Sequence, residues 1–151
     1  MITIADILQP RGIDLDLKPT TPQEAVFQVA SLLKDDERVA DWTAFYNGLA
    51  SRNPCIAANE EFEICIPHAR TNAVSSMVMS AGRSTAGILF AGAQAKVHYI
   101  FVIGVPAALA ADYLRIIGAL ARIFKDPTVE LNATTTTGEF LRILSSMEMK
   151  L

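Results

Sequence analysis

The sequence predicts an α/β domain in which helices cover a central sheet. Segments with strand-like alternation or β-branched runs are interleaved with segments of helical periodicity. Some predicted strands are separated by connections too short for a helical crossover, so we expect the sheet to be mixed. The chain has 151 residues and 51% of them are apolar, which is enough to form one domain over residues 1–151 with a sizeable core.

The first third of the chain contains one predicted strand and two predicted helices. Residues 12–17 ("GIDLDL") alternate between apolar and polar side chains, which is typical of a strand. Residues 21–36 begin with a helix start signal, because Thr21 can cap the helix and Glu24 completes a capping box. Residues 39–52 place aromatic side chains at helical spacing, and we expect this stripe to face the core.

The middle of the chain is predicted to supply most of the sheet. Residues 55–66 are irregular and then strand-like, residues 75–81 form a candidate strand, and residues 87–90 form a shorter one. The strongest candidate is residues 96–105 ("KVHYIFVIGV"), a nearly continuous run of β-branched, aliphatic and aromatic residues. Such a run is expected of a strand that is buried on both faces of its sheet.

Two further helices are predicted to close the chain. Residues 108–126 carry apolar side chains on one face, among them Tyr113, and charged side chains off that face. Residues 134–147 form the last predicted helix, and we expect Thr136 to cap it against Glu139.

Charge and composition exclude several classes of partner. The formal net charge is −3 and Lys and Arg do not cluster, so we expect no binding to nucleic acid. The N-terminal segment has acidic residues where a signal peptide has basic ones, and the longest apolar run is too short for a bilayer. We therefore expect no membrane insertion. Cys55 and Cys65 are expected to be reduced thiols in a cytoplasmic protein.

Sequence motifs for metals and nucleotides are missing. The chain has only two histidines, His68 and His98, whereas a catalytic zinc site normally needs three protein ligands. The patterns H-E-x-x-H, G-x-S-x-G and G-x-G-x-x-G and the P-loop are absent. We therefore expect no metal and no cofactor. A catalytic Ser–His–Asp triad remains an open alternative from the residues alone. His98 lies near the start of a predicted strand and is expected to be structural or on the surface.

His68 follows a proline at the end of the short apolar run "ICIPH". Because Pro67 donates no backbone hydrogen bond, we expect the ring to lie where strand pairing ends, and α/β folds build sites at such places. A neutral imidazole can attack phosphorus without a separate base. That chemistry needs one ring nitrogen held by a group such as a backbone carbonyl, and a guanidinium near the phosphoryl oxygens. A purely structural histidine is the alternative.

Two features together resemble a known family. Arg52, in "LASRNP", stands sixteen residues before His68, in "IPHAR". This combination resembles the enzyme IIA domains of the fructose–mannitol type, including their nitrogen-regulatory relatives, from the bacterial phosphoenolpyruvate:sugar phosphotransferase system. The helix at 21–33, the strand at 97–106 and the helix after it also fall where that family has them. The resemblance covers almost the whole chain and implies a mixed sheet flanked by helices on both faces.

The resemblance also implies roles for individual residues. His68 would accept a phosphoryl group from an HPr-like phosphocarrier protein, and Arg52 would lie near that group and offset its charge. Arg70 stands where some members of the family carry a basic residue. Tyr113 takes the place of a second histidine that many members have, and a phenol can still donate a hydrogen bond to a phosphoryl oxygen. Plain packing of Tyr113 within its helix is an equal alternative.

The resemblance leaves two uses for such a phosphocarrier. The phosphoryl group would pass to a IIB domain in sugar transport, or the phosphorylation state itself would act on a regulatory target protein, as in the nitrogen-regulatory branch. The sugar, the target and the formation of a homo-oligomer are left open by the sequence.

The loop before His68 departs from the family pattern. Asn53 replaces a glutamate, Ala57 and Ala58 replace hydroxyl residues, and the glycines of the loop are missing. Three glutamates also bring negative charge close to the site: Glu60, Glu61 and Glu63. The alternative function is therefore a regulatory protein-binding module of the same fold that is phosphorylated weakly or not at all. A metal-independent hydrolase is the third hypothesis.

Overall fold

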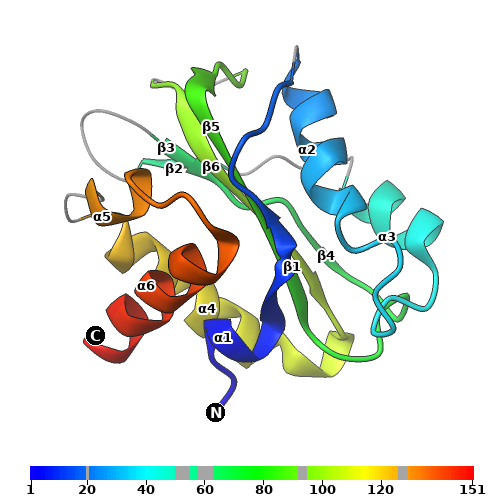
Figure 1. The fold of residues 1–151 in the computed structure, drawn as a ribbon. Helices are drawn as coiled ribbons and strands as arrows, with labels where there is room; N and C mark the ends of the chain where they lie inside the picture. The colour runs from blue at the N-terminus through cyan, green and yellow to red at the C-terminus, as the bar shows by residue number, and fades with distance from the viewer. Residues whose placement is uncertain (20, 50–54, 58–62, 92–94, 126–128) are drawn as a thin grey trace.

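The computed structural model describes residues 1–19, 21–49, 55–57, 63–91, 95–125 and 129–151. Within these ranges it has a six-stranded sheet with helices against both faces (Figure 1). The strands are β1 (Leu8–Asp14), β2 (Cys55–Ala57), β3 (Glu63–Cys65), β4 (His68–Arg70), β5 (Val78–Ile88) and β6 (Val97–Val105). The helices are α1 (Ile4–Ile7), α2 (Pro22–Ser31), α3 (Trp42–Leu49), the 3₁₀ turn η1 (Ala107–Leu109), α4 (Ala110–Ile123), α5 (Val129–Asn132) and α6 (Thr137–Met149).

The sheet contains both parallel and antiparallel neighbours. The strand order is β1-β5-β6-β3-β2, and β4 also pairs with β6. The pairs β1–β5, β3–β6 and β4–β6 are parallel, whereas β5–β6 and β2–β3 are antiparallel. The predicted mixed sheet is therefore confirmed.

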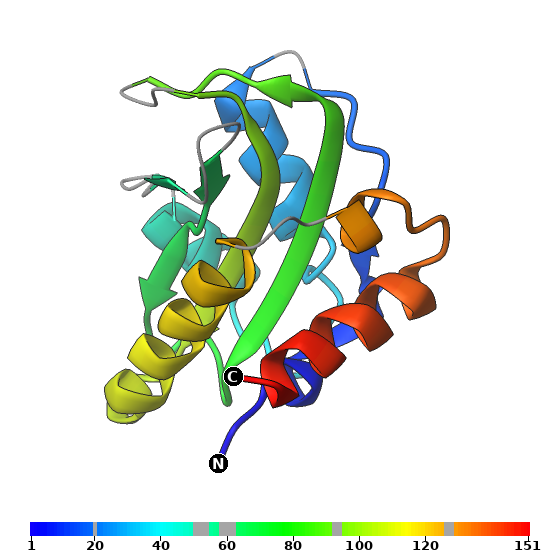
Figure 2. The same ribbon diagram turned by 90° about the vertical axis from the view of Figure 1, so that its left-hand side faces the viewer.

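Helices cover the two faces of the sheet separately. α2 and α3 pack on one face, where the buried cluster includes Val29, Phe45 and Val102. α1, α4 and α6 pack on the other face, where the cluster includes Ile116 and Phe140 (Figures 1 and 2). This arrangement confirms the implied layers, with one sheet between two sets of helices.

The central strand β6 contributes side chains to both clusters. Tyr99, Phe101 and Ile103 enter the cluster under α4 and α6, whereas Ile100 and Val102 enter the cluster under α2 and α3. All five side chains are fully buried. The continuous apolar run predicted to be a strand buried on both faces is confirmed.

The two predicted helix caps are present. The Thr21 hydroxyl accepts a hydrogen bond from the backbone N–H of Glu24 at 3.1 Å, and α2 begins directly after Thr21. The Thr136 hydroxyl accepts one from the backbone N–H of Glu139 at 3.2 Å, and α6 begins directly after Thr136. Each cap satisfies a backbone donor that has no partner within the helix.

Two strand predictions were wrong in their limits. β1 spans Leu8–Asp14 and not residues 12–17; it includes Pro10, which is tolerated because β1 lies at the edge of the sheet. The strands predicted at 75–81 and 87–90 overlap the two ends of the single strand β5 (Val78–Ile88). Gly82 does not end that strand. It makes room for neighbours, since a Cβ there would come within 2.6 Å of both Leu17 and Val29.

The aromatic stripe predicted for residues 39–52 is only partly in the core. Phe45 is fully buried, but Trp42 and Tyr46 are only partly buried. The rings of Trp42 and Tyr46 stack on each other, with their centroids 5.1 Å apart. The exposed Phe27 of α2 meets both rings edge-on. These rings form a surface cluster between α2 and α3. The end of the predicted helix lies outside the described residues.

Candidate functional site

His68 lies at a break in the strand that runs beside β6. β3 and β4 both pair with β6 in parallel, and residues 66–67 between them belong to neither strand. The Pro67 carbonyl accepts a hydrogen bond from the Ile103 backbone N–H at 3.0 Å. Pairing then resumes at His68, which is opposite Ile103. The expectation that pairing ends at His68 was therefore wrong, because Pro67, with no N–H, interrupts the ladder without ending it.

The His68 ring is held by a backbone carbonyl. Its Nδ1 lies 3.0 Å from the carbonyl oxygen of Ile66, and the side chain is partly buried. Because a carbonyl oxygen only accepts, Nδ1 carries the proton and donates it. Nε2 therefore holds the lone pair of the neutral ring. Sequence analysis did not single out Ile66, since this contact depends on the bend at the proline and leaves no residue-type signal.

Tyr113 lies beside the His68 ring. It is on the first turn of α4 and is 7% exposed. The two ring centroids are 4.9 Å apart, and the ring planes are tilted by 39°. The structure thus brings together two residues that sequence analysis linked, and it also buries Tyr113 in the cluster under α4. Both interpretations of Tyr113, packing and a place at the site, agree with this position.

Arg70 is on the same face of β4 as His68, because side chains two residues apart in a strand share a face. Its Nη2 donates a hydrogen bond to the carbonyl oxygen of Ala107 at 3.2 Å. Arg70 itself is exposed. The bond joins β4 to the 3₁₀ turn η1. This turn leads directly into α4, the helix that carries Tyr113. The guanidinium keeps further N–H donors beyond the one used here.

Arg52 lies outside the described residues, as do Asn53, Ala58, Glu60 and Glu61 of the divergent loop. The described backbone next to that loop consists of β2 and β3, which pair antiparallel. Cys65 in β3 is fully buried, and the expectation that both cysteines are reduced stays a prediction.

His98 occupies a separate place on β6. Its Nδ1 lies 2.8 Å from the carbonyl oxygen of Ser84 in the neighbouring strand β5. The ring is partly buried. The contact ties the His98 side chain to the backbone of β5 and agrees with the structural role expected of His98.

Neither a metal-binding cluster nor a membrane-spanning helix is found among the described residues. No group of three or more His, Cys, Asp or Glu side chains there is placed to hold a metal ion. None of the helices in the described ranges combines the length and the apolar character needed to span a bilayer.

Comparison with known proteins places this geometry in a family. Residues 6–147 match the family model of the phosphoenolpyruvate-dependent sugar phosphotransferase system, EIIA 2. The PTS system fructose-specific EIIA component of Haloferax volcanii is 37% identical over 111 residues, which cover 73% of this chain and 72% of that protein.

Solved structures share the fold at lower identity. The nitrogen regulatory protein IIA-Ntr from Neisseria meningitidis has a TM-score of 0.80 at 22% identity, covering 93% of this chain and 98% of its own. The complex of enzyme IIAMTL with phosphorylated enzyme IIBMTL from Escherichia coli has a TM-score of 0.75 at 17% identity. The match covers 93% of this chain and 99% of the matched chain. These two likenesses concern the fold alone. The family model spans nearly all of the sequence, so this chain belongs to the EIIA type 2 family of the phosphoenolpyruvate-dependent sugar phosphotransferase system.

Proposed function

We propose that His68 carries a phosphoryl group between two partner proteins. Nε2 attacks the phosphorus of a phosphorylated HPr-like carrier, and a bond forms between Nε2 and phosphorus. The bond between phosphorus and the carrier breaks, and its electron pair returns to the carrier. The proton on Nδ1 stays where it is, because the Ile66 carbonyl holds it. The step therefore needs no separate base, metal or cofactor.

The observation that carries this proposal is the 3.0 Å hydrogen bond between His68 Nδ1 and Ile66. It sets the tautomer in which Nε2 is the nucleophilic atom. It also stabilises the ring after transfer, since a phosphorylated imidazole that keeps its Nδ1 proton is cationic and donates more strongly to the carbonyl.

Two arginines are proposed to offset the charge of the phosphoryl group. Arg70 follows His68 on the same face of β4. For Arg52 the support is the path of the chain: β2 begins three residues after it, at Cys55, which is opposite Cys65, three residues before His68. Arginine suits this role because its planar guanidinium can contact two phosphoryl oxygens.

We further infer that the acceptor is a IIB domain in sugar transport. The Haloferax volcanii relative is named as a fructose-specific component, and enzyme IIAMTL of Escherichia coli was solved in complex with phosphorylated enzyme IIBMTL. Regulation through the phosphorylation state, in the cytoplasm, is the second use. The IIA-Ntr neighbour favours it only through the fold, at lower identity than the fructose relative.

A phosphorylation assay tests the proposal. The protein is incubated with enzyme I, HPr and phosphoenolpyruvate, and its intact mass is measured under mildly alkaline conditions. We expect an acid-labile gain of one phosphoryl mass, which a His68→Ala variant fails to acquire.

The second histidine provides a matched control. His98→Ala is expected to gain the phosphoryl mass as the unchanged protein does, because His98 is bound to Ser84 elsewhere in the sheet. A protein that gains no mass from any cognate or heterologous carrier would instead be the non-phosphorylated module of the same fold.

A further inference from the structure

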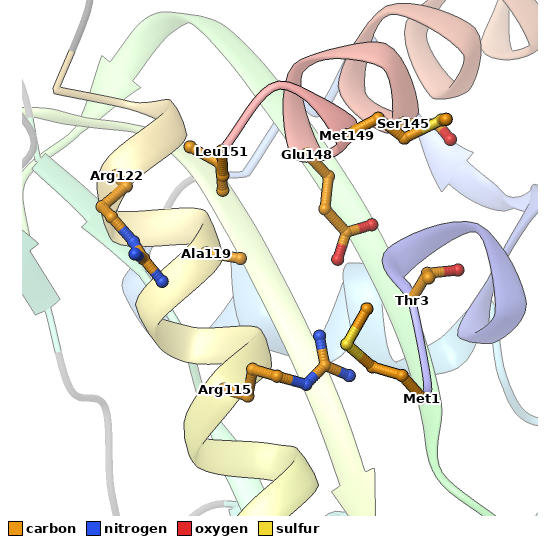
Figure 3. Close-up of a pocket in the computed structure, with 9 residues that line it drawn as sticks. All are labelled: Met1, Thr3, Arg115, Ala119, Arg122, Ser145, Glu148, Met149 and Leu151. Atoms are coloured by element: carbon orange, nitrogen blue, oxygen red, sulfur yellow. The ribbon is translucent and has the colours of Figure 1, made fainter.

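A cavity of about 540 Å³ lies between α4, α6 and the N-terminal segment. This volume is in the range of small-molecule sites. None of the residues proposed for phosphoryl transfer lines it. The residues that decide its chemistry include Arg115, Arg122 and Glu148, with Met1, Ala119 and Leu151 beside them (Figure 3).

Two groups of opposite charge in this cavity have unused hydrogen-bonding capacity. Arg115 Nη2 on α4 and Glu148 Oε2 on α6 are both buried atoms without a hydrogen-bond partner among the described residues. Figure 3 shows the guanidinium and the carboxylate extending into the same space. A buried charged group without a partner costs free energy. The two atoms therefore indicate where a ligand gains most by binding.

One oxygen of the Glu148 carboxylate holds the group in place, and the other oxygen has no hydrogen-bond partner among the described residues. Its Oε1 accepts a hydrogen bond from the Ile4 backbone N–H at 2.8 Å. This bond also joins α6 to α1. Oε2 is thus presented to the cavity by a carboxylate that cannot turn without giving up Ile4. No ion pair joins Glu148 to Arg115 in the described part of the chain.

The charges select the class of ligand. A simple anion would be attracted by Arg115 and Arg122 but repelled by Glu148, and a simple cation would meet the reverse. A zwitterion satisfies both sides. The rest of the lining is largely apolar, with the side chains of Met1, Ala119, Met149 and Leu151. Met1, Met149 and Leu151 are exposed, so this side of the cavity is open to solvent.

We propose that this cavity binds a free α-amino acid with an apolar side chain. The carboxylate of the ligand accepts from Arg115, its ammonium group donates to Glu148, and its side chain lies against the apolar lining. The proposal is independent of phosphoryl transfer, because it concerns other residues and reversible binding.

Titration of the whole chain with L-methionine, followed by backbone amide chemical shifts, tests the proposal. We expect saturable shifts in α4 and α6 with a Kd at or below about 1 mM. Analogues that lack the amino group or the carboxylate should bind at least about tenfold more weakly, since each leaves one buried atom of Arg115 or Glu148 without a partner. No saturation up to about 10 mM, or equal binding of the three compounds, would overturn the proposal.

Variants locate the binding. Arg115→Gln and Glu148→Gln should each weaken L-methionine binding at least about tenfold, and Glu148→Gln keeps an oxygen to accept from Ile4. Arg142→Gln and Glu37→Gln remove exposed charges outside the cavity and should bind as the unchanged protein does. Unchanged affinity in both cavity variants would place the amino acid elsewhere and contradict the assignment.

Discussion

At the scale of single residues, the orientation of one ring decides what the proposed site can do. The Nδ1 atom of His68 is hydrogen-bonded to the Ile66 carbonyl. The ring of Tyr113, on α4, packs against the His68 ring. Pro67 has no N–H, so the strand is interrupted at residues 66–67, and the carbonyl of Ile66 is available to the ring. The site is thus defined by backbone geometry as much as by residue types.

Tyr113 is predicted to contribute a hydroxyl to the site as well as a packed ring. Tyr113→Phe keeps the ring, so the free energy of unfolding should change by less than about 1 kcal/mol, while phosphoryl transfer should slow about fivefold, the size of one hydrogen bond of ~1 kcal/mol. Transfer kinetics and urea denaturation of the same variant measure both effects. An unchanged transfer rate would leave Tyr113 with packing alone.

Arg52 is predicted to act on transfer and not on folding. Arg52→Ala should slow phosphorylation by HPr by at least about tenfold, because a charge-assisted contact to a phosphoryl oxygen is worth roughly 1.5–3 kcal/mol. The free energy of unfolding should fall by less than about 1 kcal/mol, because the role proposed for Arg52 is in transfer and not in folding. If the two losses are equal in kcal/mol, Arg52 is a structural residue.

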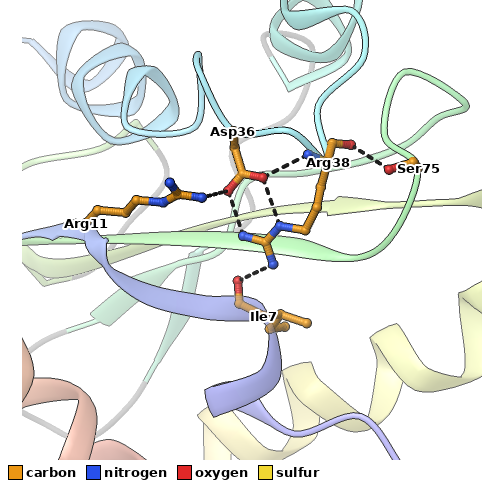
Figure 4. A network of polar contacts seen from close by, with 5 residues as sticks. All are labelled: Ile7, Arg11, Asp36, Arg38 and Ser75. Carbon is orange, nitrogen blue, oxygen red and sulfur yellow. Dashed lines mark hydrogen bonds and ion pairs between the residues drawn. The ribbon is translucent and has the colours of Figure 1, made fainter.

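At the scale of elements, the connection between α2 and α3 supports the segment that follows β4. Ser75 and Ala40 form backbone hydrogen bonds to the carbonyls of Arg38 and Ala73, both at 2.8 Å. Asp36 anchors this connection by accepting from Arg38 Nε at 2.9 Å and Nη2 at 2.7 Å (Figure 4). Arg38 Nη1 also donates to the Ile7 carbonyl at 3.2 Å. The network links three separate parts of the chain.

The Asp36 network predicts a dependence of stability on pH. The hydrogen bonds from Arg38 hold the pKa of Asp36 below its ordinary value of 3.8, although burial opposes them. A carboxylate with a lowered pKa in the folded state stabilises the fold above its unfolded pKa, and this contribution is lost as the pH falls through the folded pKa. Unfolding in urea at a series of pH values measures it.

A substitution isolates this contribution. Asp36→Asn should lower the free energy of unfolding by ~3 kcal/mol at neutral pH, as expected when one partner of a buried pair is removed. The difference from the unchanged protein should shrink below pH ~3.8. Asp35→Asn, at an exposed position next to it, serves as the control. A difference that stays constant with pH would mean that the charge of Asp36 does not matter.

Two glycines are predicted to respond oppositely to alanine. A Cβ at Gly104 of β6 would come within 2.8 Å of Phe45 and 3.0 Å of Val74 and Val78, so Gly104→Ala should destabilise the fold by about 1–3 kcal/mol. At Gly118 of α4 the nearest atom is 3.8 Å away, on Arg122, so Gly118→Ala should stabilise by ~0.5–1 kcal/mol. Thermal unfolding compares them, and a loss at both positions would contradict the packing described for α4.

At the scale of the whole molecule, the sequence predicted the layers better than the limits of their elements. The run at 96–105 identified the central strand. A strand that is buried on both faces is apolar at nearly every position, so it stands out as a continuous apolar run in the sequence. β5 was divided in two in the prediction, whereas Gly82 lies within the strand because it makes room for Leu17 and Val29 from distant parts of the chain. Since β6 enters both apolar clusters, we propose that residues 1–151 form one domain.

For the candidate site, the sequence named residues and expected a group such as a backbone carbonyl to hold the ring, but it did not identify which carbonyl. The spacing of Arg52 and His68 pointed to a family, and the structure adds the Ile66 carbonyl and the contact of Arg70 with Ala107. Backbone contacts of this kind leave no trace in residue identity. The cavity with Arg115 and Glu148 was missed for a similar reason, since two charged residues on different helices have no recognisable spacing.

The most direct measurement for the central claim is the position of phosphorus on the histidine ring. In the phosphorylated protein labelled with ¹⁵N, scalar coupling between ³¹P and ¹⁵N identifies the bonded nitrogen. We predict coupling to Nε2 of His68, with Nδ1 still protonated toward the Ile66 carbonyl. Coupling to Nδ1, or phosphorus on any other residue, would contradict the account.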